Sequence, residues 1–205
     1  MKALITILSL PYFLLGFIFH RKKSINRDLN LCIEYINKNR DKSSKIDEIY
    51  LRVLLLAEDH RSETHYGVDP IAIMRCIYVR STKKITQGGS TIEQQLVRTI
   101  TSRYERTLRR KIREQVISIL LFNRVKDKKI IWQTYLYSAY FGHMKVGFFN
   151  LEINELLDPS EMIARLKYPT KKNEIPIENK KIQKRKSHID SLIDKSTSAY
   201  NRKTC

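Results

Sequence analysis

Apolar residues recur along the chain at helical spacing, in runs separated by charged segments. One run lies between residues 46 and 57, and its members are Ile46, Ile49, Tyr50, Val53, Leu54 and Ala57. Ser44 precedes Asp47 with the spacing of a capping box, which predicts that a helix begins there. That helix would hold Glu58 at its end, where a carboxylate is fixed by the packed helix and still faces outward, as a general base requires.

A second helix is predicted after the only Gly-Gly pair of the sequence. Ser90 and Glu93 have the spacing of another capping box. The helix that they predict carries Gln94 and Arg98 four residues apart, on one face. A helix that starts after Gly88-Gly89 exposes backbone N–H groups to which an anion binds, although an ordinary capped helix shows the same pattern.

A third helix is predicted over residues 106–122. Its apolar side consists of Leu108, Ile112, Val116, Ile119 and Leu120. The opposite side carries Arg106, Arg110, Arg113 and Glu114. A solvated face with an intrahelical ion pair, worth roughly 0.2–0.5 kcal/mol, is one interpretation, and a diphosphate site is the other.

Further helices are predicted over 130–141, 160–166 and 182–192, and the low counts of glycine (6) and proline (5) also favour helix over sheet.

The first apolar run extends from Ala3 to Phe19 and has basic residues on both sides. Its residues rise about 1.5 Å each and span roughly 25 Å, at the short end for crossing a bilayer. We expect a membrane anchor, kinked at Pro11, with a cleaved signal peptide and a buried soluble helix as alternatives. The cluster Arg21–Lys23 follows the run, and the positive-inside tendency favours the cytoplasm for that side.

The composition adds a strong positive charge to this picture. Among 205 residues, 39 are Lys or Arg and 21 are Asp or Glu, which gives a net charge of +18. This excess favours an anionic partner: nucleic acid, an acidic membrane surface or a phosphate-bearing substrate. Residues 68–86 mix apolar and cationic side chains, which is typical of an amphipathic surface helix or of a flap in the membrane interface. Cys32, Cys76 and Cys205 have no spacing typical of a disulfide framework or a zinc site.

Five motifs occur in a fixed order: AEDHRSETHYGVD, QGGSTIEQQLVR, RTLRRKIRE, YLYSAYFG and SEMIARLKYP. Together they resemble the ordered motifs of glycosyltransferase family 51, the peptidoglycan glycosyltransferases, over residues 46–192. No stretch resembles a penicillin-binding transpeptidase domain, so the resemblance is to the monofunctional form. It implies an all-α fold, with a lysozyme-like lobe and a small membrane-associated jaw. It also implies polymerisation of lipid II into β-1,4-linked glycan strands, with release of undecaprenyl diphosphate.

The resemblance implies roles for individual residues. Glu58 matches the general base that deprotonates the acceptor 4-hydroxyl, and Glu114 matches the second catalytic glutamate, on the diphosphate side. The expected substrate-binding residues are Asp59, His65, Arg75, Ser90, Gln94, Arg98, Arg106, Arg110 and Arg113. A divalent cation, Mg²⁺ or Mn²⁺, often assists in the family, and we expect no organic cofactor. The expected partners are lipid II, the growing glycan strand, membrane lipids and other cell-wall synthesis proteins, and not nucleic acid.

The chain departs from the family pattern at Ser62, Glu93, Arg98, Arg113, Gln133 and Tyr137. Glu93 stands where a threonine is usual and adds negative charge near the expected groove. Arg98 and Arg113 stand where lysines are usual, so the charge is kept and the geometry changes. The two glutamates with catalytic roles are retained, and we therefore expect activity.

We expect an anchor with its basic flank in residues 1–23, a linker in 24–45, the family-51-like domain in 46–192 and a polar tail in 193–205. We therefore expect a single-pass protein of the bacterial cytoplasmic membrane, with the catalytic domain on the extracytoplasmic face. Two alternatives stay open. One is a divergent relative that acts on another polyprenyl-diphosphate-linked glycan or is an inactive scaffold, and the other is a membrane-anchored basic protein that binds nucleic acid or acidic lipid.

Overall fold

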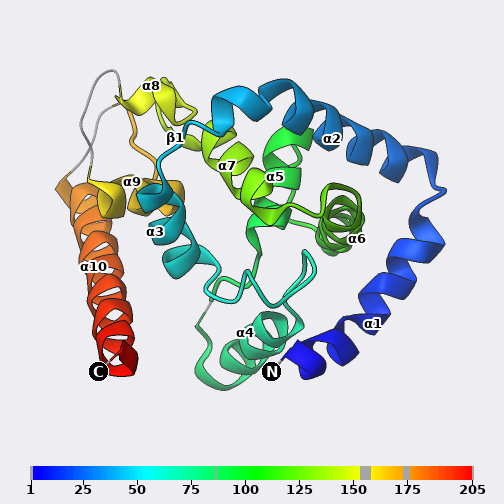
Figure 1. The fold of residues 1–205 in the computed structure, drawn as a ribbon, viewed down its shortest axis with the longest axis horizontal. Coiled ribbons are helices and arrows are strands. Elements are labelled where there is room, and N and C mark those ends of the chain that lie inside the picture. The colour runs from blue at the N-terminus through cyan, green and yellow to red at the C-terminus, as the bar shows by residue number, and fades with distance from the viewer. Residues whose placement is uncertain (1, 86, 153–157, 173–175, 205) are drawn as a thin grey trace. The chain divides into compact units, whose positions relative to one another are not determined.

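The expected all-α fold is confirmed by the computed structural model, which describes residues 2–85, 87–152, 158–172 and 176–204 (Figure 1). Within the described residues, strands occur only in one two-stranded ribbon. The chain divides into two compact units, which are described separately below. Unit 1 consists of Met1–Ser44 with Arg61–Tyr135, and unit 2 consists of Lys45–His60 with Leu136–Cys205.

Unit 1 is a group of helices packed around α6. Its helices are α1 (Lys2–Phe19), α2 (Lys23–Ser43), α4 (Pro70–Lys83), α5 (Ile92–Thr101), α6 (Leu108–Val125) and most of α7 (Lys128–Ser138). Helix α6 packs against α1, α2 and α5 (Figure 1). The fully buried core includes Ile36, Ile92, Leu96, Ile117, Ile119, Leu121 and Ile131. Burial of such a side chain stabilises the fold by roughly 1.5–3 kcal/mol, so these residues fix α5 and α6 against each other.

The capping box predicted for α5 is displaced by one residue. The N-cap is Thr91 and not Ser90, because the Thr91 hydroxyl accepts a hydrogen bond from the Gln94 N–H at 3.3 Å. The same hydroxyl donates to the carbonyl of Gly67 at 2.8 Å. The Ser90 hydroxyl instead accepts a hydrogen bond from Lys111 at 2.7 Å. A tertiary contact therefore selects the cap between two adjacent hydroxyl residues.

The expected core helix is α3 (Glu48–Glu58) of unit 2, and its start also differs from the prediction. Asp47 is the N-cap, with its carboxylate accepting from the Ile49 N–H at 2.9 Å, whereas Ser44 is the C-cap of α2. The end of the helix agrees with the prediction, because Glu58 is its last residue. The core of unit 2 thus holds Glu58 on the last turn of a packed helix.

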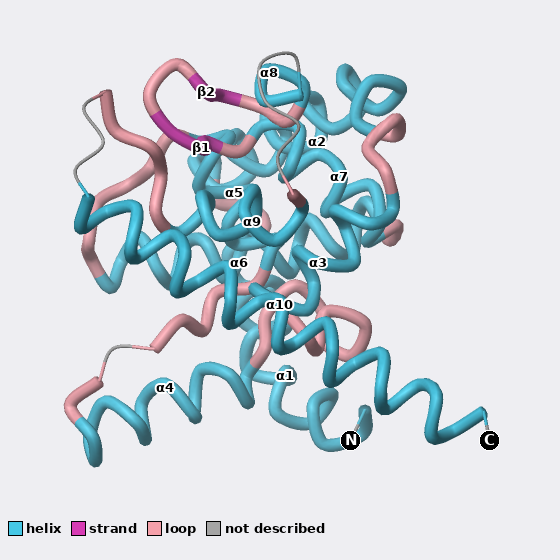
Figure 2. The backbone as a smooth tube through the Cα atoms, turned by 90° about the vertical axis from the view of Figure 1, so that its left-hand side faces the viewer, coloured by secondary structure: helices cyan, strands magenta, loops and turns pink. Residues whose placement is uncertain are grey.

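Unit 2 combines three packed helices with a small ribbon. Besides α3, its elements are β1 (Tyr140–Gly142), β2 (Lys145–Val146), α8 (Phe149–Glu152), α9 (Pro159–Lys167) and α10 (Pro176–Thr204). Helices α3, α9 and α10 pack against one another (Figure 1). The two strands are antiparallel, and the ribbon lies beside α8 (Figure 2). The expected last helix, 182–192, is therefore the middle of the longer α10, and Cys205 at the end of the expected tail lies outside the described residues.

The helix predicted over 130–141 is wrong at its end. Helix α7 stops at Ser138, and the next residues form β1. The Phe141 carbonyl accepts from the Thr170 N–H at 3.0 Å, so this segment pairs with distant backbone and does not continue the helix. Gly142 has φ +150°, and a Cβ there would lie 2.3 Å from the Thr170 hydroxyl oxygen, which allows only glycine at this close approach.

The predicted apolar side of α6 is also wrong in its first turns. Leu108 and Ile112 are exposed, whereas Val116 and Ile119 are buried as expected. Residues 24–45, expected as a linker, are mostly helix α2, which packs against α5 and α6. The core of unit 1 thus extends towards the N-terminus further than the apolar pattern indicates.

Helix α1 is long and apolar enough to cross a membrane, with a mean hydropathy of 1.9 over 18 residues. It contacts α6 and α4 through one side, where Gly16 lies against Ile119 and Leu120. Its exposed apolar residues are Leu4, Ile7, Leu10, Leu14, Phe17 and Ile18. This mostly exposed apolar surface supports the predicted anchor over a buried soluble helix, and a cleaved signal peptide stays an alternative.

Candidate active site

Unit 1 gathers cationic side chains around one buried carboxylate, that of Glu114 on α6, which is 2% exposed. Arg98, from the last turn of α5, donates from Nε to Oε1 of Glu114 at 2.9 Å and from Nη2 to Oε2 at 3.1 Å. Arg110, one turn earlier on α6, donates from Nη1 to Oε1. Charge-assisted, bidentate pairs of this kind are among the strongest hydrogen bonds in proteins. The interpretation of this face as solvated is therefore wrong for Glu114, whereas the intrahelical ion pair that belongs to the same interpretation is present between Arg110 and Glu114.

Lys111 completes the cluster, and the sequence analysis missed it. Its Nζ donates to the Ser90 hydroxyl at 2.7 Å and to Oε1 of Gln94 at 2.7 Å, and lies 3.9 Å from Oε2 of Glu114. Burial lowers the pKa of Lys111 to about 8, with Glu114 acting in the opposite direction. The available signal was its position three residues before Glu114, on the same side of the helix.

The electrostatics of the cluster follow from these contacts. The hydrogen bond to Glu114 raises the pKa of Arg98, which is therefore a permanent cation. Three cations surround a single carboxylate, so the cluster carries an excess of positive charge. Five predicted site residues meet here: Ser90, Gln94, Arg98, Arg110 and Glu114.

Arg113 is not directed to this cluster. It donates from Nη2 to Oδ2 of Asp28 at 2.7 Å and from Nε to the same oxygen at 2.9 Å. Arg103 donates to that oxygen as well, at 3.1 Å. Asp28 is on α2, so Arg113 ties α2 to α6, and its expected contact with substrate stays a prediction.

Two further predicted residues stay apart from the cluster. Arg106 is exposed in the segment before α6, and it makes no hydrogen bond or ion pair within the described part of the chain. Arg75 is on α4, and its Nε is buried with no hydrogen-bond partner among the described residues. Their predicted contacts with substrate stay predictions.

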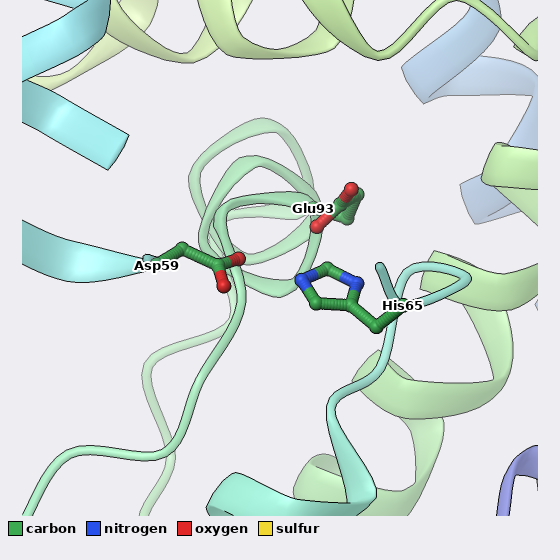
Figure 3. A group of neighbouring side chains, drawn as sticks. All are labelled: Asp59, His65 and Glu93. Atoms are coloured by element: carbon green, nitrogen blue, oxygen red, sulfur yellow. The ribbon is translucent and has the colours of Figure 1, made fainter. Parts of the chain in front are cut away.

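His65 and Glu93 form a second buried group in unit 1 (Figure 3). Nδ1 of His65 accepts from the Gly67 N–H at 3.2 Å, which fixes the ring orientation. A nitrogen of this ring and a carboxylate oxygen of Glu93 lie within 4.8 Å of each other. The negative charge that Glu93 adds to the family pattern is thus placed beside the motif histidine. Figure 3 also labels Asp59, which belongs to unit 2.

In unit 2, Glu58 is held by a residue of α10 that the sequence analysis did not single out. Nη2 of Arg185 donates to Oε1 of Glu58 at 2.9 Å and to the carbonyl of Ala57 at 2.9 Å. Both charged side chains are mostly buried. Asp59 follows as the buried C-cap of α3. Arg185 lies within a lysine-rich stretch, and nothing in the sequence distinguishes it from its neighbours.

The described residues thus form a helical fold in which fixed cations surround a buried acid. Comparison with known proteins gives the family. The protein-family model described as Transglycosylase matches residues 29–189, which is most of the chain. The protein therefore belongs to the transglycosylases of glycosyltransferase family 51. The match begins within α2, before the start expected at residue 46.

Several penicillin-binding proteins are similar to this chain. Penicillin-binding protein 1A of Aquifex aeolicus is 34% identical over 160 residues, which cover 73% of this chain and 22% of that protein. Penicillin-binding protein 1A of Haemophilus influenzae is 28% identical over 195 residues, which cover 86% of this chain and 23% of that protein. The protein of the same name from Escherichia coli is 30% identical over 180 residues, which cover 82% of this chain and 21% of that protein. The chain thus spans about a fifth of the length of these relatives.

Proposed function

We propose that the protein is a peptidoglycan glycosyltransferase that polymerises lipid II into β-1,4-linked glycan strands and releases undecaprenyl diphosphate. The observation that carries the proposal is the cationic cluster held by buried Glu114, because a lipid diphosphate is the anion that such a cluster suits. Family membership supports the same reaction. The membrane anchor predicted in α1 agrees with a lipid-linked substrate, and we assign the domain to the extracytoplasmic face.

The acceptor step is assigned to Glu58. A sugar 4-hydroxyl is too weak an acid to ionise freely near neutral pH, so its proton must leave as its oxygen attacks the anomeric carbon of the donor. Arg185 engages Oε1 of Glu58, and we assign Oε2 as the atom that accepts the proton. Arg185 is then a positioning residue, because it fixes the carboxylate through two contacts to the end of α3.

The leaving-group step is assigned to the cluster of unit 1. As the new bond to the acceptor oxygen forms, the bond between the anomeric carbon and the diphosphate oxygen breaks, and negative charge builds on that oxygen. Fixed positive groups stabilise such charge without reorganisation during the reaction. We assign this role to the side chains of Arg98, Arg110 and Lys111.

The test uses the full chain in detergent with labelled lipid II. Glu58→Gln keeps the shape of the side chain and removes the proton acceptor, and we expect polymer formation to fall by about 10²–10⁴-fold. Glu63→Gln is the matched control, because Glu63 is an exposed acid five residues later and should retain the full rate. The polymer should be digested by lysozyme and its formation blocked by moenomycin.

Two results would contradict the proposal. Equal polymer from Glu58→Gln and wild type would remove the assignment of the base. Turnover of a different polyprenyl-diphosphate glycan, with lipid II left intact by the wild-type protein, would favour the divergent relative. Circular dichroism of each variant separates loss of activity from loss of fold.

A further inference from the structure

Both oxygens of the Glu114 carboxylate are engaged by fixed cations. Oε1 accepts from Nε of Arg98 at 2.9 Å and from Nη1 of Arg110. Oε2 accepts from Nη2 of Arg98 at 3.1 Å and has Nζ of Lys111 at 3.9 Å. The guanidinium fork of Arg98 therefore covers the edge of the carboxylate on which a metal ion would bind.

This arrangement does not suit the divalent cation that the family resemblance implies. Mg²⁺ requires near-octahedral oxygen ligands at about 2.0–2.1 Å and usually binds through one or two carboxylates. A carboxylate offers about four lone-pair positions, and three N–H donors already occupy three of those of Glu114, with Nζ of Lys111 3.9 Å from Oε2. An incoming divalent ion would also be repelled by the three cations around it. Glu114 is thus a poor metal ligand in this chain.

The fixed groups themselves supply the charge that such an ion would bring. Arg98, Arg110 and Lys111 with Glu114 leave a net charge of +2 while Lys111 is protonated. Ser90 and Gln94 orient the ammonium group of Lys111 through two hydrogen bonds of 2.7 Å. The donors are already in place, so an arriving diphosphate requires little rearrangement.

We propose that this cluster receives the diphosphate of the lipid-linked donor without a divalent cation, with Glu114 holding the cations in place of binding a metal. Arg98 is the residue that makes this arrangement, because the single ammonium group of a lysine cannot grip both carboxylate oxygens in one plane. The inference deepens the proposed function and rests on it. Glu114 is then a positioning residue, which acts through Arg98 and Arg110.

The first test measures polymer from lipid II by the full chain in excess EDTA and again with Mg²⁺ or Mn²⁺ restored. We expect the two rates to agree within about twofold, whereas an enzyme whose metal neutralises the leaving group loses at least about 100-fold on chelation. Polymer that forms only with metal overturns the inference and leaves the proposed function intact. Intact lipid II under both conditions counts against the proposed function.

The second test measures binding without turnover, by calorimetry with inorganic pyrophosphate in EDTA. We expect wild type to bind, and Arg98→Lys to bind at least about tenfold more weakly in EDTA, with Mg²⁺ restoring part of the loss. Arg109→Lys is the matched control, because Arg109 is an exposed arginine of α6, the helix that carries Glu114, and it should bind as wild type does. Pyrophosphate binding by wild type that requires Mg²⁺ overturns the inference.

Mn²⁺ binding, followed by electron paramagnetic resonance, locates any metal directly. The inference expects the Mn²⁺ signal of Glu114→Gln to equal that of wild type. Mn²⁺ that binds to wild type and is lost in Glu114→Gln overturns it. If Glu114→Gln does not fold, the same comparison is made with Arg98→Lys, in which a freed carboxylate oxygen should increase Mn²⁺ binding.

Discussion

The replacement of Asp28 by asparagine tests how α2 is held against the rest of unit 1. The Asp28 carboxylate is 2% exposed and accepts three hydrogen bonds of 2.7–3.1 Å from Arg113 and Arg103. Asparagine keeps the shape, but its amide group has one oxygen fewer and directs N–H groups towards guanidinium donors. Removal of one partner of a fully buried ion pair costs about 3–5 kcal/mol.

The cost here should be smaller, because water reaches part of both arginines. Their side chains are 33% exposed for Arg103 and 17% exposed for Arg113. We therefore expect a loss of about 2–3 kcal/mol in the free energy of unfolding of unit 1. For a chain of this size, each kcal/mol lowers Tm by about 2–4 °C, so Tm should fall by about 4–12 °C.

The assay is thermal unfolding in detergent followed by circular dichroism, with hydrogen exchange of α2 as a local readout. Arg27→Gln is the control, because Arg27 is 69% exposed and lies 3.7 Å from the other oxygen of Asp28. It should change stability by less than about 0.5 kcal/mol. If Asp28→Asn had the same Tm as Arg27→Gln and kept the protection of α2, the pairing of Arg113 with Asp28 would not stabilise unit 1, which would contradict the structural role assigned to it.

Lys111 has a pKa of about 8, lowered from 10.5 by burial, so it is charged below that pH and loses its charge as the pH rises through it. The affinity for pyrophosphate in EDTA should therefore decline above pH 8 in wild type relative to Lys111→Arg. If the affinities of the two proteins changed with pH in the same way, a group other than Lys111 would be responsible for the decline. Gly67→Ala should cost at least about 2 kcal/mol in urea unfolding, because φ is +86° and the new Cβ would lie 2.5 Å from the Ser118 carbonyl oxygen. Gly88→Ala, with no atom within 4 Å of its Cβ, should stay within about 0.5 kcal/mol, and equal losses in both would rule out strain at Gly67.

Local pattern was sufficient for the features that depend on local physics. The apolar spacing between residues 46 and 57 predicts α3 and its end at Glu58, and Val53 and Leu54 of the predicted stripe are buried. Ile49 of that stripe is exposed, whereas Leu51, which is outside it, is buried. The motif RTLRRKIRE predicts a helix with Glu114 one turn after Arg110, and the structure pairs these residues. The family membership inferred from the motifs is confirmed by the match over residues 29–189.

The errors occur where a distant residue decides the local structure. Thr91 replaces Ser90 as a cap because the carbonyl of Gly67, 24 residues earlier, accepts a hydrogen bond from the Thr91 hydroxyl. The pairing of Arg113 with Asp28 joins residues 85 apart in the sequence, and that of Arg185 with Glu58 joins residues 127 apart. Helical periodicity contains no information on such pairs, since it reports only which side of one helix is apolar.

The most informative error concerns the charged face of α6. A face with three arginines and one acid has the composition of a solvated surface, and propensity alone cannot distinguish it from a buried one. In the structure it packs against α5, and the carboxylate of Glu114 is removed from water among groups of mostly one sign. One carboxylate balances only one of the three cations, whose side chains keep 14–28% of their surface exposed, so the cluster retains a surplus of positive charge that a ligand can reach. This surplus, held beside a carboxylate that already accepts three hydrogen bonds, is the observation on which the proposed anionic ligand rests. The proposed diphosphate ligand therefore rests on the placement of Arg98, Arg110 and Lys111 and not on the net charge of the chain.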